Sequence, residues 1–258
     1  MRLRSLAFSV ATSLVIATTA AQAADLYGSV KDEPREVEYR GFSWTGVYGG
    51  IHAGGAWGDA TLTENLPNLL GILPPSISSG HDMDGGIAGV HLGANKQFGN
   101  IVLGAELRLS GSDISGSNAD CFGITTLAGG LATADCNSSV NWVGSAMAKV
   151  GYAWDRWMLY GNIGWAVAGV DHRATLSVDP QILPISLSSA TNETADGLSY
   201  GVGFEFAATE NIIFGLEYTR TELQADGSGL LLGGVLTTGS RDIDLDEVKA
   251  RLSYKFGG

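Results

Sequence analysis

Eight segments of the chain alternate, residue by residue, between an apolar side chain and a small or polar one. In residues 101–109 every odd position is aliphatic or Ala, while the even positions include Gly104, Glu106 and Arg108. A period of two predicts a β-strand with one apolar face. The segments span about residues 45–58, 84–96, 101–109, 140–152, 157–169, 197–207, 212–222 and 246–256. Each is long enough for the roughly 9 to 11 residues of a tilted strand that crosses a membrane.

The connections between these segments alternate in length. Residues 97–100, 153–156 and 208–211 are tight connections, whereas residues 59–81, 112–138, 172–194 and 223–241 are long ones, mostly rich in Gly, Ser, Thr, Asn and Asp. Short turns at one end and long loops at the other are typical of outer-membrane barrels. The sequence therefore predicts an all-β protein, an eight-stranded antiparallel up-and-down transmembrane β-barrel. Both termini would lie in the periplasm, and the eighth strand would close against the first.

The face opposite the apolar one distinguishes this barrel from a soluble β-sandwich or a lipocalin-like barrel, whose apolar face points inward. A solvent face would be crowded with charge, but only 16% of the chain is charged, and this face is mostly Gly, Ser and Asn. Its few charges have both signs and suit ion pairs in the narrow interior of an eight-stranded barrel. The predicted lumen charge network consists of Glu106, Arg108, Lys149, Glu205, Glu217, Glu247, Lys249 and Arg251.

Aromatic residues on the apolar face gather at its two ends. Those near the short turns are Phe98, Tyr152, Trp157, Phe206, Phe214, Tyr254 and Phe256. Those toward the long loops are Trp57, Trp142, Trp165, Tyr200 and Tyr218. Two aromatic belts are what the two membrane interfaces favour, and a soluble core gives no reason for such a separation. The apolar face is therefore expected to meet lipid.

The N-terminus predicts export. Residues 1–23 begin with Arg2 and Arg4, continue as an apolar stretch and end in Ala21-Gln22-Ala23, the pattern of a secretory signal peptide cleaved after Ala23. Residues 24–43 are mixed in charge without apolar periodicity and are interpreted as a periplasmic N-terminal segment. Residues 44–258 are then the barrel. The expected location is the outer membrane of a Gram-negative cell.

Export also bears on Cys121 and Cys136, the two cysteines of the chain. An oxidising compartment would let them form a disulfide, which is worth about 3 kcal/mol in the chain-entropy model. Free thiols are the alternative. A zinc site is disfavoured because neither a His nor a second Cys pair lies nearby.

The charge of the chain and its motifs exclude several functions. A net charge of −12 and a pI near 4.6 argue against a nucleic-acid partner. No phosphate-binding loop, metal-ligand spacing or nucleophile elbow is present, so we predict no enzyme and no cofactor. His81 and His172 fall in predicted loops and are interpreted as solvated. His52 and His91 face the lumen on adjacent strands and could meet there, where a hydrogen-bonding role is favoured over ligand binding.

Acidic residues mark the loop ends of the strands. Asp59, Asp84, Asp113, Asp171, Asp196, Glu222, Asp242, Asp244 and Asp246 all keep the parity of the outward face of their strands. They would form an acidic collar facing the head groups of lipopolysaccharide. Carboxylates there repel anionic phosphates unless Ca²⁺ or Mg²⁺ bridges the two, since hard cations prefer oxygen ligands. Asp242, Asp244 and Asp246 are the candidate ligands; ordinary soluble strand ends are the alternative.

Several motifs are similar to those of one family. Residues 44–50 read WTGVYGG, residues 151–161 read GYAWDRWMLYG, residues 201–206 read GVGFEF, residues 216–218 read LEY and residues 254–256 read YKF. Together they resemble the small alphaproteobacterial outer-membrane β-barrel proteins, the porin-like immunogenic surface antigens, over essentially the whole mature chain. Members normally finish on the aromatic residue that the barrel assembly machinery reads, whereas here Gly257 and Gly258 follow Phe256. The cysteine pair is a second departure.

The resemblance and the residues together favour a structural surface protein that supports the envelope and presents loops to the outside. A small porin-like channel is the first alternative, although side chains just fill the interior of an eight-stranded barrel. Loop-mediated binding of haem or of a host surface is the second; haem is suggested by the family, with His81 and His172 as the histidines in the loops. The expected partners are outer-membrane lipids, lipopolysaccharide and the assembly machinery, and the oligomeric state is left open.

Overall fold

A computed structural model of the chain describes residues 41–65, 76–119, 132–178, 186–231 and 235–256. The signal peptide, most of the N-terminal segment, Cys121 and the terminal glycines lie outside the described residues. The strands are β1 (Gly46–Asn65), β2 (Ser76–Phe98), β3 (Ile101–Asn118), β4 (Ala132–Trp154), β5 (Trp157–Val178), β6 (Ser186–Ala207), β7 (Ile212–Leu231) and β8 (Val235–Phe256).

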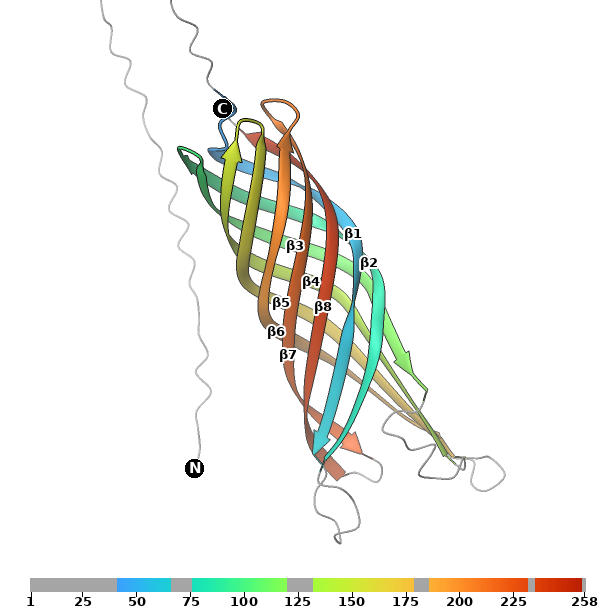
Figure 1. Ribbon diagram of the computed structural model, residues 1–258. Helices are drawn as coiled ribbons and strands as arrows, with labels where there is room; N and C mark the ends of the chain where they lie inside the picture. The colour runs from blue at the N-terminus through green and yellow to red at the C-terminus, as the bar shows by residue number, and fades with distance from the viewer. Residues whose placement is uncertain (1–40, 66–75, 120–131, 179–185, 232–234, 257–258) are drawn as a thin grey trace, which may run out of the picture. The chain divides into compact units, whose positions relative to one another are not determined.

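These strands form one closed antiparallel barrel in which each pairs with its neighbours in sequence (Figure 1). Closure comes from β1 and β8, which pair from Val47 opposite Phe256 to Asn65 opposite Thr238. The described connections between β2 and β3, β4 and β5, and β6 and β7 are short turns at one end of the barrel (Figure 1). The predicted fold is confirmed. No helix among the described residues is long and apolar enough to cross a membrane.

The strands are 7 to 11 residues longer than predicted at the loop end. β4 begins at Ala132, β6 at Ser186 and β8 at Val235, so much of each predicted long loop is strand. These extensions were not recognised in the sequence because their outward face is rich in Ser, Thr, Gly and Asp, a composition typical of loops, while their inward face mixes apolar and polar residues. Beyond the membrane a strand can carry polar residues on its outer face, because water surrounds it there.

One predicted orientation is wrong for the same region. Strict alternation along residues 140–152 puts Asn141 on the face of Lys149, in the lumen, but Asn141 is exposed, and its Nδ2 donates to Asp171 Oδ2 at 2.6 Å on the outside. The register of β4 against β5 shifts between Val140 and Trp142. Such a bulge inserts one extra residue and so reverses the alternation beyond it. Residues on the loop side of Asn141 therefore point to the opposite face from the one that simple counting gives.

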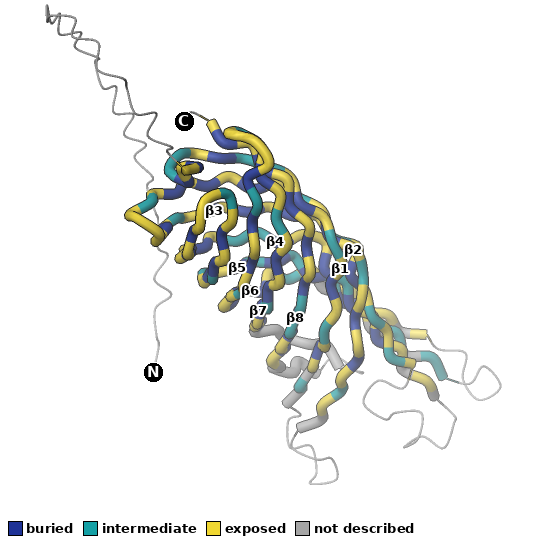
Figure 2. The backbone as a smooth tube through the Cα atoms, turned by 45° about the horizontal axis from the view of Figure 1, so that its top comes forward, coloured by how far each residue is buried: buried dark blue, intermediate teal, exposed yellow. Residues whose placement is uncertain are grey.

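The two faces of the barrel differ as the alternation requires (Figure 2). The outer face exposes large apolar side chains along the middle of every strand, among them Ile51, Leu107 and Leu216. Trp57 and Trp165 are about half exposed toward the loop end, and Tyr152 and Phe256 toward the turns. We take the stretch between these two belts as the membrane-spanning part. The strands continue beyond it on the loop side.

The interior is filled in layers. Near the turns, an apolar cluster contains Phe42, Trp44, Val102, Ala153, Met158, Tyr160, Ala207 and Ile213. Nearer the loops, a second apolar cluster contains Ala56, Ala60, Met83, Ile114, Val140, Val143, Ala166, Ala168, Val170, Ala195, Leu223, Ala225, Ile243 and Leu245. Buried charged residues occupy the level between them. The barrel therefore encloses a packed core, as the small radius of eight strands requires.

Glycines make room for the largest interior side chains. A Cβ on Gly93 would lie 2.5 Å from the Tyr48 ring, and one on Gly203 would lie 2.3 Å from the Tyr160 ring. Each glycine is directly opposite its tyrosine in the strand register. The two tyrosines thus lie flat over neighbouring backbone and bring their hydroxyls into the charged layer.

Candidate functional site

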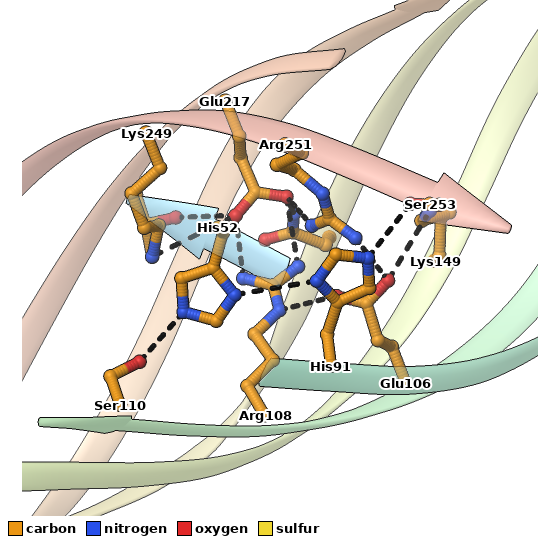
Figure 3. A network of polar contacts seen from close by, with 12 residues as sticks. His52, His91, Glu106, Arg108, Ser110, Lys149, Glu217, Lys249, Arg251 and Ser253 are labelled. Atoms are coloured by element: carbon orange, nitrogen blue, oxygen red, sulfur yellow. Dashed lines mark hydrogen bonds and ion pairs between the residues drawn. The ribbon is translucent and has the colours of Figure 1, made fainter. Parts of the chain in front are cut away.

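The charged layer at mid-barrel is the most elaborate polar arrangement in the described chain (Figure 3). Glu217 of β7 lies at its centre. Its carboxylate contacts Arg108 Nη1 of β3 at 2.7 Å and Arg251 Nη1 of β8 at 2.6 Å. It also accepts hydrogen bonds from Tyr160 Oη at 2.7 Å and Asn162 Nδ2 at 3.2 Å. Charges from strands on opposite sides of the barrel therefore meet at one carboxylate.

Glu106 of β3 is the second centre. It pairs with Arg108 Nε at 2.5 Å and with Arg251 Nη2, and it accepts a hydrogen bond from Tyr48 Oη at 2.7 Å. Lys149 Nζ lies 3.6 Å from the same carboxylate. Arg251 thus bridges Glu106 and Glu217, and it links the two centres into one network.

Lysines complete the network at its edges. Lys149 Nζ lies 5.0 Å from the centre of the Tyr48 ring and 4.2 Å from that of Tyr160, and it pairs with Glu205 at 3.1 Å. Lys249 pairs with Glu247. The predicted set is therefore brought together as four carboxylates and four cations, all buried: Glu106, Glu205, Glu217, Glu247, Arg108, Lys149, Lys249 and Arg251. The charges balance, as a dry interior demands.

His52 and His91 meet beside this network. Their Nδ1 atoms are 3.3 Å apart, and each Nε2 lies 2.8 Å from a hydroxyl, that of Ser110 for His52 and that of Ser253 for His91. All four ring nitrogens therefore have partners within the barrel. This arrangement is hydrogen bonding that fills space, and it leaves no nitrogen for a ligand.

Little free volume remains at this level. A cavity of about 10 Å³ is lined by hydroxyls, among them Ser199, Thr219 and Thr221, together with Glu247 and Lys249. That volume holds about one water molecule. The side chains thus occlude the lumen, and the arrangement is suited to stability rather than to the passage of a solute.

The acidic collar lies on the outer surface at and beyond the loop-side belt: Asp84 and Asp246 are opposite Trp57 in the register, and Asp59 and Asp244 lie nearer the loops. All nine of its members are exposed or half exposed on the outward face. Asp82, Asp59, Asp244 and Glu222 lie in register on adjacent strands and form a row of carboxylates. A hydrogen bond with Asp82, followed by burial and by the negative charges of Asp82 and Asp244, raises the pKa of Asp59.

Part of this acidity is neutralised within the protein. Arg220 pairs with Asp244 at 2.9 Å, with Asp246 at 3.1 Å and with Glu222 at 3.5 Å. Among the described residues, no group of three or more His, Cys, Asp or Glu side chains is arranged to hold a metal ion. A divalent cation at Asp242, Asp244 and Asp246 therefore stays a prediction, and two of these candidate ligands already share an arginine.

His81 and His172 are not loop residues, contrary to the prediction. They lie on β2 and β5, point into the barrel and are only 9% and 7% exposed. Burial lowers the pKa of both imidazoles, that of His172 to about 4 with the charge of Arg241 as the next cause. Both are therefore uncharged at neutral pH. Their parity with Met83 and Val170, two residues away, was the signal in the sequence that would have placed them inside.

Cys136 is buried on the inward face of β4, whereas Cys121 lies outside the described residues. The disulfide between them stays a prediction.

A closed antiparallel barrel with a charged, packed interior and an apolar outer face between two aromatic belts defines an integral outer-membrane protein. The chain belongs to the family of the outer membrane protein beta-barrel domain, whose profile matches residues 9–256. The protein therefore resides in the outer membrane of a Gram-negative bacterium.

Two curated relatives agree with this assignment. The 31 kDa outer-membrane immunogenic protein of Brucella melitensis is 32% identical over 246 residues, which cover 92% of this chain and 94% of the relative. The 22 kDa outer membrane protein of Rhizobium leguminosarum is 30% identical over 169 residues, covering 65% of this chain and 64% of the relative. Both names describe outer-membrane proteins, in keeping with the family that the motifs resemble.

Two solved structures of other proteins are similar to this chain at low sequence identity. The outer membrane protein OprG of Pseudomonas aeruginosa has a TM-score of 0.47 at 15% identity, covering 83% of this chain and 97% of its own. The attachment invasion locus protein of Yersinia pestis has a TM-score of 0.31 at 15% identity, covering 81% and 99%.

Proposed function

We propose that this outer-membrane surface protein has a structural role: a closed barrel that supports the envelope and holds its loops outside the cell. The observation that carries the proposal is the balanced charge network that fills the lumen between two apolar clusters. A solute path would need mobile water where Glu106, Glu217 and Arg251 are buried against one another. The immunogenic relative in Brucella supports exposure of the loops.

Neither catalysis nor loop-mediated haem binding is part of this proposal. The two histidines that suggested haem binding by loops lie buried on strands inside the barrel. Ser138, which contacts His172 Nδ1 at 2.8 Å, is 1% exposed and so is withdrawn from any substrate outside.

We expect no stable large conductance steps when the folded protein is inserted into a planar lipid bilayer, because side chains fill the lumen. The measurement is single-channel recording in about 1 M salt, a concentration at which general porins also conduct. Insertion is verified separately by comparing boiled and unboiled samples on a gel, where a folded barrel migrates differently. A general porin in the same bilayer is the positive control. Reproducible large steps from verified, inserted protein would contradict a closed lumen.

Lipopolysaccharide is the proposed partner of the outer face, with divalent cations bridging its phosphates to the acidic collar. We expect EDTA to lower the melting temperature of the barrel in lipopolysaccharide, and Mg²⁺ to restore it, because unbridged carboxylates and phosphates repel each other. The melting temperature of the variant Asp59→Asn/Asp82→Asn should respond less to EDTA. This variant removes the two carboxylates of the row that form no ion pair with Arg220. A detergent without phosphates is the matched control. Identical melting with and without EDTA would refute the bridge.

A further inference from the structure

A ring of polar side chains lies inside the barrel toward the loops. Each of its members lies two residues nearer the loops than a residue of the apolar cluster on the same strand. The cluster residues are Met83, Val140, Val170, Ala195 and Ile243, and the ring residues are, in the same order, His81, Ser138, His172, Glu193 and Arg241. Residues two apart in a strand share a face. The polar ring therefore rests on an apolar floor, which separates it from the charged layer at mid-barrel.

Most of the ring is paired within itself. Arg241 of β8 forms an ion pair with Glu193 of β6, so their charges cancel. Ser138 Oγ lies 2.8 Å from His172 Nδ1. On β3 the ring has Gly116, where a Cβ would come within 2.8 Å of His81 Cδ2, so the missing side chain leaves space for that imidazole.

Three nitrogen atoms of the ring are left over: Nε of Arg241, which can only donate a proton, and two imidazole nitrogens, which can carry a lone pair. The Nε2 atoms of His81 and His172 are buried, and neither has a hydrogen-bond partner within the part of the chain that the structure describes. Both side chains are at least nine-tenths buried. They come from β2 and β5 and converge through the strands between: the ring of His81 lies over Gly116 of β3, Gly116 is opposite Ser138 of β4 in the register, and Ser138 is opposite His172. Buried polar atoms without partners are uncommon in folded proteins, and each calls for something that binds it.

The chemistry of these atoms selects the ligand. When Nδ1 of His172 donates its proton to Ser138, the lone pair of Nε2 is available to an electrophile. Holding a ring through its other nitrogen is how proteins orient histidines that bind metals. Neutral imidazole suits Zn²⁺, Cu²⁺ and Ni²⁺, whereas Ca²⁺ and Mg²⁺ prefer oxygen.

We propose that His81 and His172 bind one divalent transition-metal ion through their Nε2 atoms, with Ser138 as a positioning residue. The described residues supply no third His, Cys, Asp or Glu ligand. Water would therefore complete the coordination. The site is distinct from the acidic collar, which lies on the outer surface and offers only oxygen.

The test is titration of the full chain, folded in detergent, with Cu²⁺ alone. We expect one ion per barrel and an electron paramagnetic resonance spectrum with hyperfine structure from two imidazole nitrogens. His81→Gln and His172→Gln should each weaken binding at least tenfold and remove one nitrogen from the spectrum. Ser138→Ala should weaken binding by about tenfold while keeping both nitrogens, because it frees the ring of His172.

Two controls make the result specific. His52→Gln removes a histidine whose ring nitrogens are both bonded inside the barrel and should leave Cu²⁺ affinity unchanged. Asp59→Asn/Asp82→Asn tests whether the ion sits on the outer carboxylates and should also leave it unchanged. Gel mobility of unboiled samples shows that each variant is folded. The proposal is overturned if folded protein binds no Cu²⁺, or if both histidine variants bind as tightly as the parent.

Discussion

Replacing Arg251 with methionine should destabilise the folded barrel by about 3 to 5 kcal/mol, the usual cost of removing one partner from a buried ion pair. Arg251 is 4% exposed and bridges Glu106 and Glu217. Methionine fills a similar volume but removes one of the two arginines, Arg251 and Arg108, that Glu106 and Glu217 share. Urea unfolding in detergent micelles, followed by the folded band on a gel, measures the loss.

Matched variants separate charge from shape. Arg251→Lys keeps the charge, so its loss should be smaller than that of Arg251→Met, but it lacks the planar guanidinium fork that bonds both carboxylates, so some stability should still be lost. Arg251→Met/Glu217→Gln also removes the one negative charge that the loss of Arg251 leaves in excess, and it should recover part of the stability. Arg156→Met breaks an exposed pair with Glu210 and should cost about 0 to 1 kcal/mol. Equal losses for Arg251→Met and Arg156→Met would show that the network does not hold the barrel together.

The membrane-spanning part of the fold could be predicted from the sequence because its alternation has a physical cause on both faces. Residues such as Leu107 and Leu109 must meet lipid, and their chain neighbours Glu106 and Arg108 must not. The same two-residue rule predicted which charges share the lumen and that His52 and His91 meet.

Other parts could not be predicted, because they depend on register and on local irregularity. Glu217 and Arg108 lie on β7 and β3, and only the closed barrel brings them within 2.7 Å. The bulge near Asn141 changes the parity of one strand without a mark in the sequence. The positions of His81 and His172 were predicted wrongly for two other reasons. The polar composition of the strand extensions is typical of loops, and the shared parity of each histidine with its apolar neighbour was not used.

A third feature that alternation cannot predict is the packing that closes the barrel at its turn end. Residues that precede the first strand close it. Trp44 is 1% exposed and packs edge-on against Phe42, with their ring centres 4.9 Å apart. Its Nε1 donates to the Asp155 carbonyl at 3.2 Å, and its backbone N–H donates to Gln97 Oε1 at 2.8 Å. Asp155 adopts a left-handed φ of 54° in the β4–β5 turn, so a strained turn residue holds this segment.

Trp44→Ala should therefore destabilise the barrel by about 3 to 5 kcal/mol, because it removes a buried aromatic ring and leaves a cavity at the end of the lumen. Trp44→Phe, which keeps most of the apolar volume, should lose less. Trp57→Ala is the matched control: that ring is 48% exposed on the outer face, so its truncation leaves no interior cavity. Urea midpoints of the refolded variants in one detergent measure the differences. If Trp44→Ala unfolds at the same urea concentration as Trp57→Ala, the segment before β1 contributes nothing to closing the barrel.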